Sequence, residues 1–184
     1  LLHQPAFEEV FDKDFHLKGQ WHNKFFNNSN PIVLELGCGK GEYTVALARM
    51  FPEKNFIGID IKGARMWRGA KTATEEQLSN VAFVRTRIEF IRSIFGGNEV
   101  SEIWITFPDP QMKSNRRKKR LTAAGFLNSY RTFLKPDGII HLKSDSQFLH
   151  EFTKCIIKEN ELAMLATCND IYGTGFADDQ LSIK

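Results

Sequence analysis

Five short apolar runs alternate along the chain with five segments whose apolar residues recur at helical spacing. Alternation of this kind is typical of a parallel sheet wrapped by helices. The runs are apolar on both of their alternating faces, as expected of strands buried on both sides. The expected strands span residues 32–36, 55–59, 81–84, 102–107 and 138–142, and the expected helices span 42–51, 65–78, 89–95, 121–134 and 147–159. The sequence therefore predicts a Rossmann-like, doubly wound α/β fold, with a mostly parallel sheet and helices on both faces.

The two ends of the chain follow this pattern less well. Residues 1–30 are less regular and end in a turn-prone stretch, so we expect an N-terminal extension followed by one domain over residues 31–184. Residues 162–167 have the composition of a sixth strand. The chain begins with Leu1 rather than a methionine, so we expect that its natural N-terminus is missing.

Composition narrows the function classes. A chain of 184 residues with 42% hydrophobic residues is long enough to bury a core as one domain. No apolar run approaches the length that spans a bilayer, and no signal-peptide pattern opens the chain. The three cysteines form no C-x-x-C pair and the five histidines have no ligand spacing. We therefore expect a cytoplasmic protein with no metal and no membrane partner.

The positive charge of the chain is concentrated in one segment. The net charge is only +3, but residues 113–120 hold six of the 25 Lys and Arg residues and no acid. The other 19 cations are outnumbered by the 22 acids. This concentration favours an anion-binding patch, and a solvated charged loop is the alternative. Directly before the segment, Asp109 stands between Pro108 and Pro110 at the end of the fourth expected strand.

The first expected strand runs directly into Gly37-Cys38-Gly39-Lys40-Gly41 and then into a helix. Glycines at a strand–helix turn allow backbone N–H groups to approach a ligand closely. Ligands of doubly wound folds bind outside the carboxyl ends of the strands, where this loop is expected to lie. Gly37, Gly39 and Gly41 are therefore candidate ligand-binding residues.

Two acids near this loop distinguish between classes of cofactor. Asp60 ends the second expected strand, where an acid can accept hydrogen bonds from both hydroxyls of a ribose. A dinucleotide fingerprint requires glycine at position 42, but the chain has Glu42. Glu35, at the mouth of the loop, repels a pyrophosphate and favours an amine or a sulfonium cation. S-adenosylmethionine carries both of these groups and is the cofactor that we expect.

Several motifs together resemble the bacterial tRNA (guanine-N7)-methyltransferases, which have the class I methyltransferase fold. The motifs occur in that family's order over most of residues 32–172. The most specific is Phe-Pro-Asp-Pro at 107–110, followed by a basic run that ends in Lys-Arg-Leu-Thr at 119–122. The others are Leu-Glu-Leu-Gly-Cys-Gly-Lys-Gly at 34–41, Gly-Ile-Asp at 58–60 and His-Leu-Lys-Ser-Asp at 141–145.

The resemblance implies methyl transfer from S-adenosylmethionine to N7 of a guanosine in tRNA, with S-adenosylhomocysteine as the product. It implies that Asp109 is the catalytic residue, and that Lys113 and Asp145 bind the substrate. The cofactor-binding positions that it implies beside the glycine loop are Glu35, Asp60, Arg87, Ile88 and Asp109. The segment that it implies to meet tRNA comprises Asn115, Arg116, Arg117, Lys118, Lys119 and Arg120.

The chain departs from the family pattern at three places. Gln111 and Met112 stand where the family usually has Trp-Pro. Arg87 and Ile88 occupy the stretch where the family usually has an aspartate near the adenine, so backbone groups and Ile88 are expected there instead. The family's T-x-x-E substrate motif and last strand lie beyond Lys184, so we expect the last strand to be missing from this chain.

Two alternatives stay open at this point. The first is another class I methyltransferase, acting on a different RNA base or a small molecule. Enzymes that modify an adenine amine usually follow the Asp109-Pro110 position with proline and an aromatic residue, and this chain does not. The second is a non-catalytic RNA-binding scaffold subunit, against which the presence of Glu35, Asp60 and Asp109 argues. The sequence leaves both a monomer and a weak homodimer open.

Overall fold

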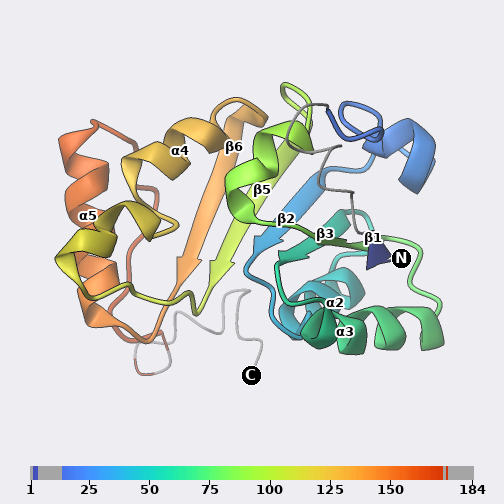
Figure 1. Cartoon of the computed structure of the whole chain (residues 1–184), viewed down its shortest axis with the longest axis horizontal. Coiled ribbons are helices and arrows are strands. Elements are labelled where there is room, and N and C mark those ends of the chain that lie inside the picture. Colours follow the sequence, from blue (N-terminus) through green and yellow to red (C-terminus); the bar gives the residue numbers. More distant parts are fainter. Residues whose placement is uncertain (1, 4–13, 172, 174–184) are drawn as a thin grey trace.

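The computed structural model describes residues 2–3, 14–171 and 173. The described strands form one six-stranded, all-parallel sheet in the order β1-β4-β3-β2-β5-β6 (Figure 1). They are Leu2–His3 (β1), Ile32–Leu36 (β2), Asn55–Asp60 (β3), Val81–Arg85 (β4), Val100–Thr106 (β5) and Leu134–Lys143 (β6). The α-helices are Glu42–Met50 (α2), Gly63–Glu75 (α3), Ala124–Tyr130 (α4) and Gln147–Glu159 (α5). Shorter helical turns are Trp21–Phe26 (η1), Ile88–Ser93 (η2) and Ser114–Lys119 (η3).

The order of the strands reverses at β2. The chain adds β3 and then β4 on one side of β2, and later adds β5 and β6 on the other side. Because all strands are parallel, their carboxyl ends meet at one edge of the sheet, which is the lower edge in Figure 1. The reversal between β2 and β5 creates the crevice in which folds of this kind bind ligands.

Each face of the sheet is covered by its own hydrophobic core. Along β2, Ile32 and Leu34 point to one core and Val33 to the other, as the two-residue period of a strand requires. Helices α2 and α3 cover the face of Val33, and η1, η2 and the end of α4 cover the opposite face. The predicted doubly wound sheet with helices on both faces is therefore confirmed.

The boundaries of one strand and two helices differ from the predicted ones. The predicted strand at 138–142 begins earlier, at Leu134, and its pairing with β5 shifts register between Val100 and Glu102. The shift accommodates Pro136, which lacks the N–H that a regular ladder uses. The predicted helix at 121–134 is reduced to α4, and the predicted helix at 89–95 is the 3₁₀ turn η2.

The sixth strand predicted at residues 162–167 does not form. This stretch has no strand structure, and Leu165 is 75% exposed. A strand is stable only when a neighbour takes up its backbone hydrogen bonds, and none of the described segments pairs with this one. Composition alone therefore overestimated the order of this segment.

Part of the predicted N-terminal extension packs with the rest of the fold. Leu2–His3 pairs with β4, and Phe15, Leu17 and Trp21 belong to the core of the sheet face that η1 covers. Residues 4–13 of the extension lie outside the described residues. The boundary at residue 31 stays a prediction.

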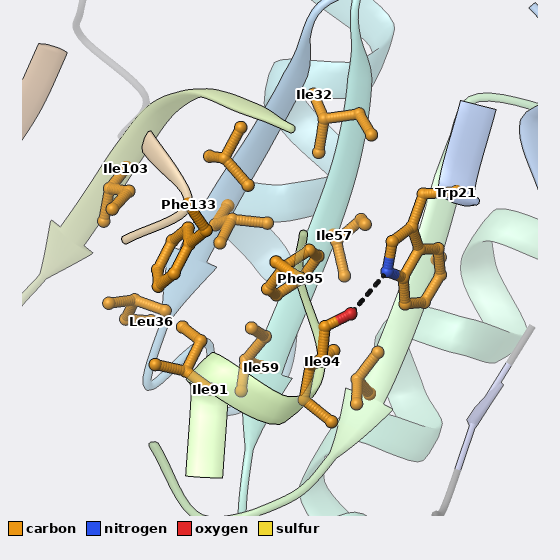
Figure 2. Close-up of a cluster of buried hydrophobic side chains, with 14 of the residues drawn as sticks. Trp21, Ile32, Leu36, Ile57, Ile59, Ile91, Ile94, Phe95, Ile103 and Phe133 are labelled. Carbon is orange, nitrogen blue, oxygen red and sulfur yellow. Dashed lines mark hydrogen bonds between the residues drawn. The ribbon is translucent and has the colours of Figure 1, made fainter. Parts of the chain in front are cut away.

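Trp21 holds this N-terminal segment in place (Figure 2). Its side chain is fully buried, and its ring stacks on Phe95 at 5.7 Å between centroids. Its indole Nε1 donates a hydrogen bond of 3.1 Å to the carbonyl oxygen of Ile94. Its backbone N–H donates one of 3.0 Å to Oε1 of Glu99. One residue thus ties η1 to the segment that leads into β5.

We predict that Trp21→Phe lowers the free energy of unfolding by about 1–3 kcal/mol. The smaller ring leaves a cavity, and the Ile94 carbonyl loses its donor. Urea denaturation measures the change. Trp67→Phe is the matched control, because Trp67 is 59% exposed and its replacement should stay within about 0.5 kcal/mol. Equal effects of the two substitutions would contradict this account of the core.

Candidate functional site

The loop after β2 is shaped by three glycines with positive φ angles. Gly37, Gly39 and Gly41 have φ angles of 76°, 57° and 74°, which place each of them in the left-handed region that favours glycine. Their loop folds back on β3, since the N–H groups of Gly37 and Cys38 both donate to the carbonyl oxygen of Ile59. Helix α2 begins directly after Gly41.

The third glycine is also required by packing. A Cβ atom at Gly41 would stand 2.5 Å from Cε1 of Phe83, far inside van der Waals contact. A Cβ atom built on Gly58 would stand 2.7 Å from the same ring, and one built on Gly69 would stand 2.8 Å from it. Phe83 therefore fills the space beneath the loop, and three glycines allow β3, α2 and α3 to close around it.

Asp60 connects the glycine loop to the end of β3. Its Oδ2 accepts a hydrogen bond of 3.0 Å from the N–H of Gly39, and its Oδ1 accepts one of 2.7 Å from the N–H of Lys62. The acid is half-buried at the carboxyl end of its strand, as the sequence predicted. Asp60 thus joins the glycine loop to the turn that follows β3.

Glu35 lies beneath the loop rather than at its surface. Only 3% of the residue is exposed. Its Oε2 accepts hydrogen bonds from the N–H of Thr44, at 2.8 Å, and from the Thr44 hydroxyl, and its Oε1 accepts one of 2.6 Å from the Thr106 hydroxyl. Burial raises the pKa of Glu35, and these hydrogen bonds partly oppose that rise.

The space above the loop fits S-adenosylmethionine. Apart from its chain neighbours, no described residue has an atom within 4 Å of a Cβ built on Gly37 or on Gly39, so side chains there would extend into a region beside Asp60 that the described residues leave open. Backbone groups with no side chain in front of them and a nearby carboxylate suit the ribose and the amino acid part of that molecule. Arg87 and Ile88 lie at the start of η2, with Arg87 exposed and Ile88 half-buried.

The Phe-Pro-Asp-Pro stretch forms a strained turn after β5. Phe107 and Gln111 both have left-handed backbone angles, with φ of 45° and 46°. Such angles are uncommon outside glycine and indicate a backbone held by its surroundings. Between them, Oδ1 of the exposed Asp109 accepts a hydrogen bond of 2.9 Å from the N–H of Gln111.

Two aromatic rings and a buried lysine lie beside this turn. Nζ of Lys143, at the end of β6, is 5.4 Å from the ring centroid of Tyr43 and 5.8 Å from that of Phe107. Only 6% of Lys143 is exposed. Lys143 is not among the residues predicted from the sequence, and its place two positions before the predicted substrate residue Asp145 was the available signal. Asp145 itself is exposed between β6 and α5.

The basic segment forms the turn η3 and lies on the surface. Its exposed residues are Lys113, Asn115, Arg116, Arg117, Lys118 and Lys119. None of these six is buried, and Arg117 alone among them forms an ion pair in the described part of the chain, at 3.9 Å from Glu159. The segment follows the Asp109 turn along the chain and leads from the carboxyl end of β5 toward α5, where Arg117 lies over the ring of Phe152 (Figure 1).

Arg120 differs from the rest of the basic segment. Only 4% of it is exposed, and its guanidinium donates to the carbonyl oxygens of Pro110 and Gln111. The same group lies over the rings of Phe148 and Phe152 on α5. A side chain buried in this way cannot reach a phosphate, so the expectation that Arg120 meets tRNA does not fit its surroundings.

The structure therefore brings most of the predicted residues to one edge of the sheet. The glycine loop and Asp60 lie at the ends of β2 and β3, Asp109 follows β5, and Asp145 follows β6. The edge combines backbone groups for a cofactor with an exposed carboxylate and a cationic surface. Thr44 and Thr106, which hold Glu35, were missed, because hydroxyl groups at strand and helix ends carry no distinctive pattern.

Solved structures show to which class this fold belongs. The chain is similar to an antibiotic-related methyltransferase, with a TM-score of 0.58 and 19% identity over 81% of this chain and 77% of that chain. It is also similar to a mutant of the 16S rRNA (adenine(1408)-N(1))-methyltransferase from Catenulisporales acidiphilia, with a TM-score of 0.53 and 18% identity over 85% of this chain and 75% of that chain. The fold is that of the class I methyltransferases.

Sequence relatives define the family within that class. A family model described as "Putative methyltransferase" matches residues 29–171. The tRNA (guanine-N(7)-)-methyltransferase of Christiangramia forsetii is 58% identical over 97% of this chain and 80% of its own length. The enzyme of the same name from Bacteroides thetaiotaomicron is 55% identical over 97% of this chain and 70% of its own length. The chain belongs to the tRNA (guanine-N7)-methyltransferase family.

The described residues lack two further features. No helix among them is long and apolar enough to cross a membrane. Nor does the part of the chain that the structure describes gather three or more histidine, cysteine or acidic side chains in a way that could hold a metal ion.

The raised pKa of Glu35 leads to a prediction about pH. The folded protein binds the Glu35 proton more tightly than the unfolded chain does. The resulting stabilisation is present at low pH and is lost as the pH rises from the ordinary value of 4.5 through the raised folded-state value. We expect Glu35→Gln to gain stability relative to the wild type over that rise, because the amide is never ionised.

Urea denaturation at a series of pH values measures this difference in the free energy of unfolding. Glu53→Gln is the control, since Glu53 is exposed and its substitution should leave the pH profile unchanged. Parallel profiles for the wild type and Glu35→Gln would show that burial of Glu35 has no cost in the charged form.

Proposed function

We propose that the chain transfers a methyl group from S-adenosylmethionine to N7 of a guanosine in tRNA, forming 7-methylguanosine and S-adenosylhomocysteine. Membership of the tRNA (guanine-N7)-methyltransferase family supports this reaction. The observation that carries it is that an exposed carboxylate, Asp109, and the exposed cationic turn η3 follow one another after β5, which pairs with the strand that leads into the glycine loop. A tRNA substrate also supports a cytoplasmic location.

The cofactor side of the site is proposed to use the glycine loop and the two acids. S-adenosylmethionine supplies an electrophilic methyl group on a sulfonium. N–H groups of the glycine loop and the carboxylate of Asp60 suit its polar groups, and Ile88 with the backbone near Arg87 suits its adenine. Glu35 contributes negative potential from beneath the loop, where low polarity strengthens its attraction for a cation.

Asp109 is proposed to hold and stabilise the guanine. N7 of guanine already carries an in-plane lone pair, so no base has to remove a proton from it. The enzyme has to align N7 with the methyl carbon, and alignment of this kind contributes several kcal/mol to catalysis. The purine becomes cationic as the methyl group arrives. A carboxylate beside it stabilises that charge and accepts hydrogen bonds from the N1–H and N2–H edge.

Lys113 and Asp145 are proposed to complete the substrate side. Lys113 precedes η3, and Asp145 follows β6. Both side chains are exposed, and both follow strands that end at the carboxyl edge of the sheet. Lys113 adds a positive charge and Asp145 a negative one. The proposed substrate is a neutral guanine attached to the negatively charged tRNA backbone.

The exposed residues Asn115 to Lys119 are proposed to bind tRNA phosphates. Cations on a surface turn supply affinity that is independent of sequence and weakens with salt. These residues follow Asp109 closely in the chain. Their contacts with the RNA backbone therefore also bring the target nucleotide toward Asp109.

A direct assay tests the reaction. The chain is incubated with S-adenosylmethionine carrying a labelled methyl group and with unmodified tRNA, and the nucleosides are analysed. Label in 7-methylguanosine is the expected result. Label in a methyladenosine would favour the related class of enzyme, and no label at all would favour an RNA-binding scaffold.

We predict that Asp109→Asn lowers kcat by roughly ten- to a thousand-fold. The amide keeps the size of the side chain but has no charge to stabilise the cationic purine. Binding of S-adenosylmethionine and the melting temperature should be preserved. Asp137→Asn, an exposed acid at the amino end of β6, is the control and should retain wild-type kcat. Unchanged methyl transfer in Asp109→Asn would refute this role.

We predict that replacing Arg116, Arg117 and Lys118 together with Ala raises KM for tRNA and leaves kcat nearly unchanged. If each cation meets one phosphate, the slope of log affinity against log salt should fall by about two to three. The matched control replaces Lys24, Arg131 and Lys135, which lie toward the opposite edge of the sheet, with Ala. An equal loss of salt dependence in both triple variants would show that only net charge matters.

A further inference from the structure

One peptide group connects Arg120 to the catalytic carboxylate. The carbonyl oxygen of Pro110 accepts a hydrogen bond of 3.2 Å from Nε of Arg120. The N–H of Gln111, which belongs to the same peptide group, donates one of 2.9 Å to Oδ1 of Asp109. The peptide is therefore held at both ends, by a cation at its carbonyl and by an anion at its N–H.

The guanidinium makes further contacts that fix its own position. It donates to the carbonyl oxygen of Gln111 as well, at 3.3 Å from Nε and 3.0 Å from Nη2. Its carbon lies 4.6 Å from the ring centroid of Phe148 and 4.4 Å from that of Phe152. Arg120 thus joins two successive carbonyls of the turn to α5.

No acid among the described residues forms an ion pair with Arg120. A buried charge without a counter-ion is costly, and its replacement by an apolar side chain is often neutral for stability or even stabilising. Here the guanidinium is satisfied by carbonyl oxygens and ring faces, at the base of the turn that carries Asp109. Stability alone does not explain a full positive charge at this place.

We propose that Arg120 is a positioning residue that sets the orientation of the Asp109 carboxylate through the Pro110–Gln111 peptide. The proposal rests on the proposed function only in taking Asp109 as the group that meets the guanine. It replaces the expectation that Arg120 binds tRNA.

Arg120 acts on the Pro110–Gln111 peptide in two ways. A cation at the carbonyl polarises the peptide, so that its N–H becomes a stronger donor to Oδ1 of Asp109. The left-handed backbone of Gln111 is unfavourable for a residue with a side chain and has to be held by contacts, which Arg120 supplies on both sides of it. With Oδ1 held in this way, Oδ2 is the oxygen that faces a ligand.

The contacts also explain how the basic turn is anchored. Residues 110 and 120 are joined by the same side chain, so the exposed cations between them lie on a closed loop. Phosphate contacts on that loop are then held at a fixed position relative to Asp109. Arg120 thus orients Asp109 and anchors the basic turn without touching either the base or the phosphates.

The test compares Arg120→Met with Arg117→Met at saturating tRNA. Arg117 is the matched control, since it lies three positions earlier over the same Phe152 ring, at 5.7 Å, but is exposed. We expect Arg120→Met to lower kcat by roughly ten- to a hundred-fold, as misplacement of a reacting group by about 1 Å does. Arg117→Met should instead raise KM for tRNA and keep kcat. Arg120→Lys, which retains a donor and the charge, should recover part of the lost kcat.

A double-mutant cycle with Asp109→Asn separates positioning from a general structural role. If Arg120 acts through Asp109, Arg120→Met has little further effect on kcat once Asp109 has lost its charge. The same fold loss in both backgrounds, or wild-type kcat in Arg120→Met, would overturn the proposal. If Arg120→Met does not fold, as judged by circular dichroism, the cycle is measured with Arg120→Gln, which keeps a donor but has no charge, and the same two outcomes decide. Wild-type activity in the nucleoside assay keeps a failure here distinct from a failure of the proposed reaction.

Discussion

The site is organised around a carboxylate that the ligand does not have to touch. Glu35 lies beneath the glycine loop and accepts hydrogen bonds from Thr44, at the start of α2, and from Thr106, at the end of β5. It therefore ties together the two elements on either side of the point where the strand order reverses. Any widening of the crevice would expose this buried group or break these hydrogen bonds, so Glu35 reinforces the spacing that the pairing of β2 with β5 sets.

Three further side chains support the two loops that flank Glu35. Phe83 supports the glycine loop from the core, and Asp60 holds the loop from the side through the Gly39 N–H. On the other side, Arg120 holds the turn that bears Asp109. Together these contacts hold the glycine loop and the Asp109 turn in place from within the protein.

The sequence predicted those features that have a local pattern. Alternating strands and helices indicated the fold, and glycines after a strand indicated the loop, because both follow from residues close together in the chain. Arg120 could not be distinguished from its basic neighbours, since its burial depends on aromatic residues of α5 that lie far along the sequence. Residues 162–167 were assigned to a strand from composition, whereas a strand also needs a partner that composition does not reveal. The threonines around Glu35 were missed for the same reason: their role depends on distant contacts.

The anchoring of the basic turn at both ends has a consequence for how such an enzyme can diverge. Arg120 joins the two ends of the basic turn, so the sequence between them can vary without moving the residues on either side. Residues 114–119 can then change in charge or sequence while the chemistry beside them keeps its geometry. Recognition of a new RNA can then evolve separately from catalysis, provided that the residue at position 120 is kept.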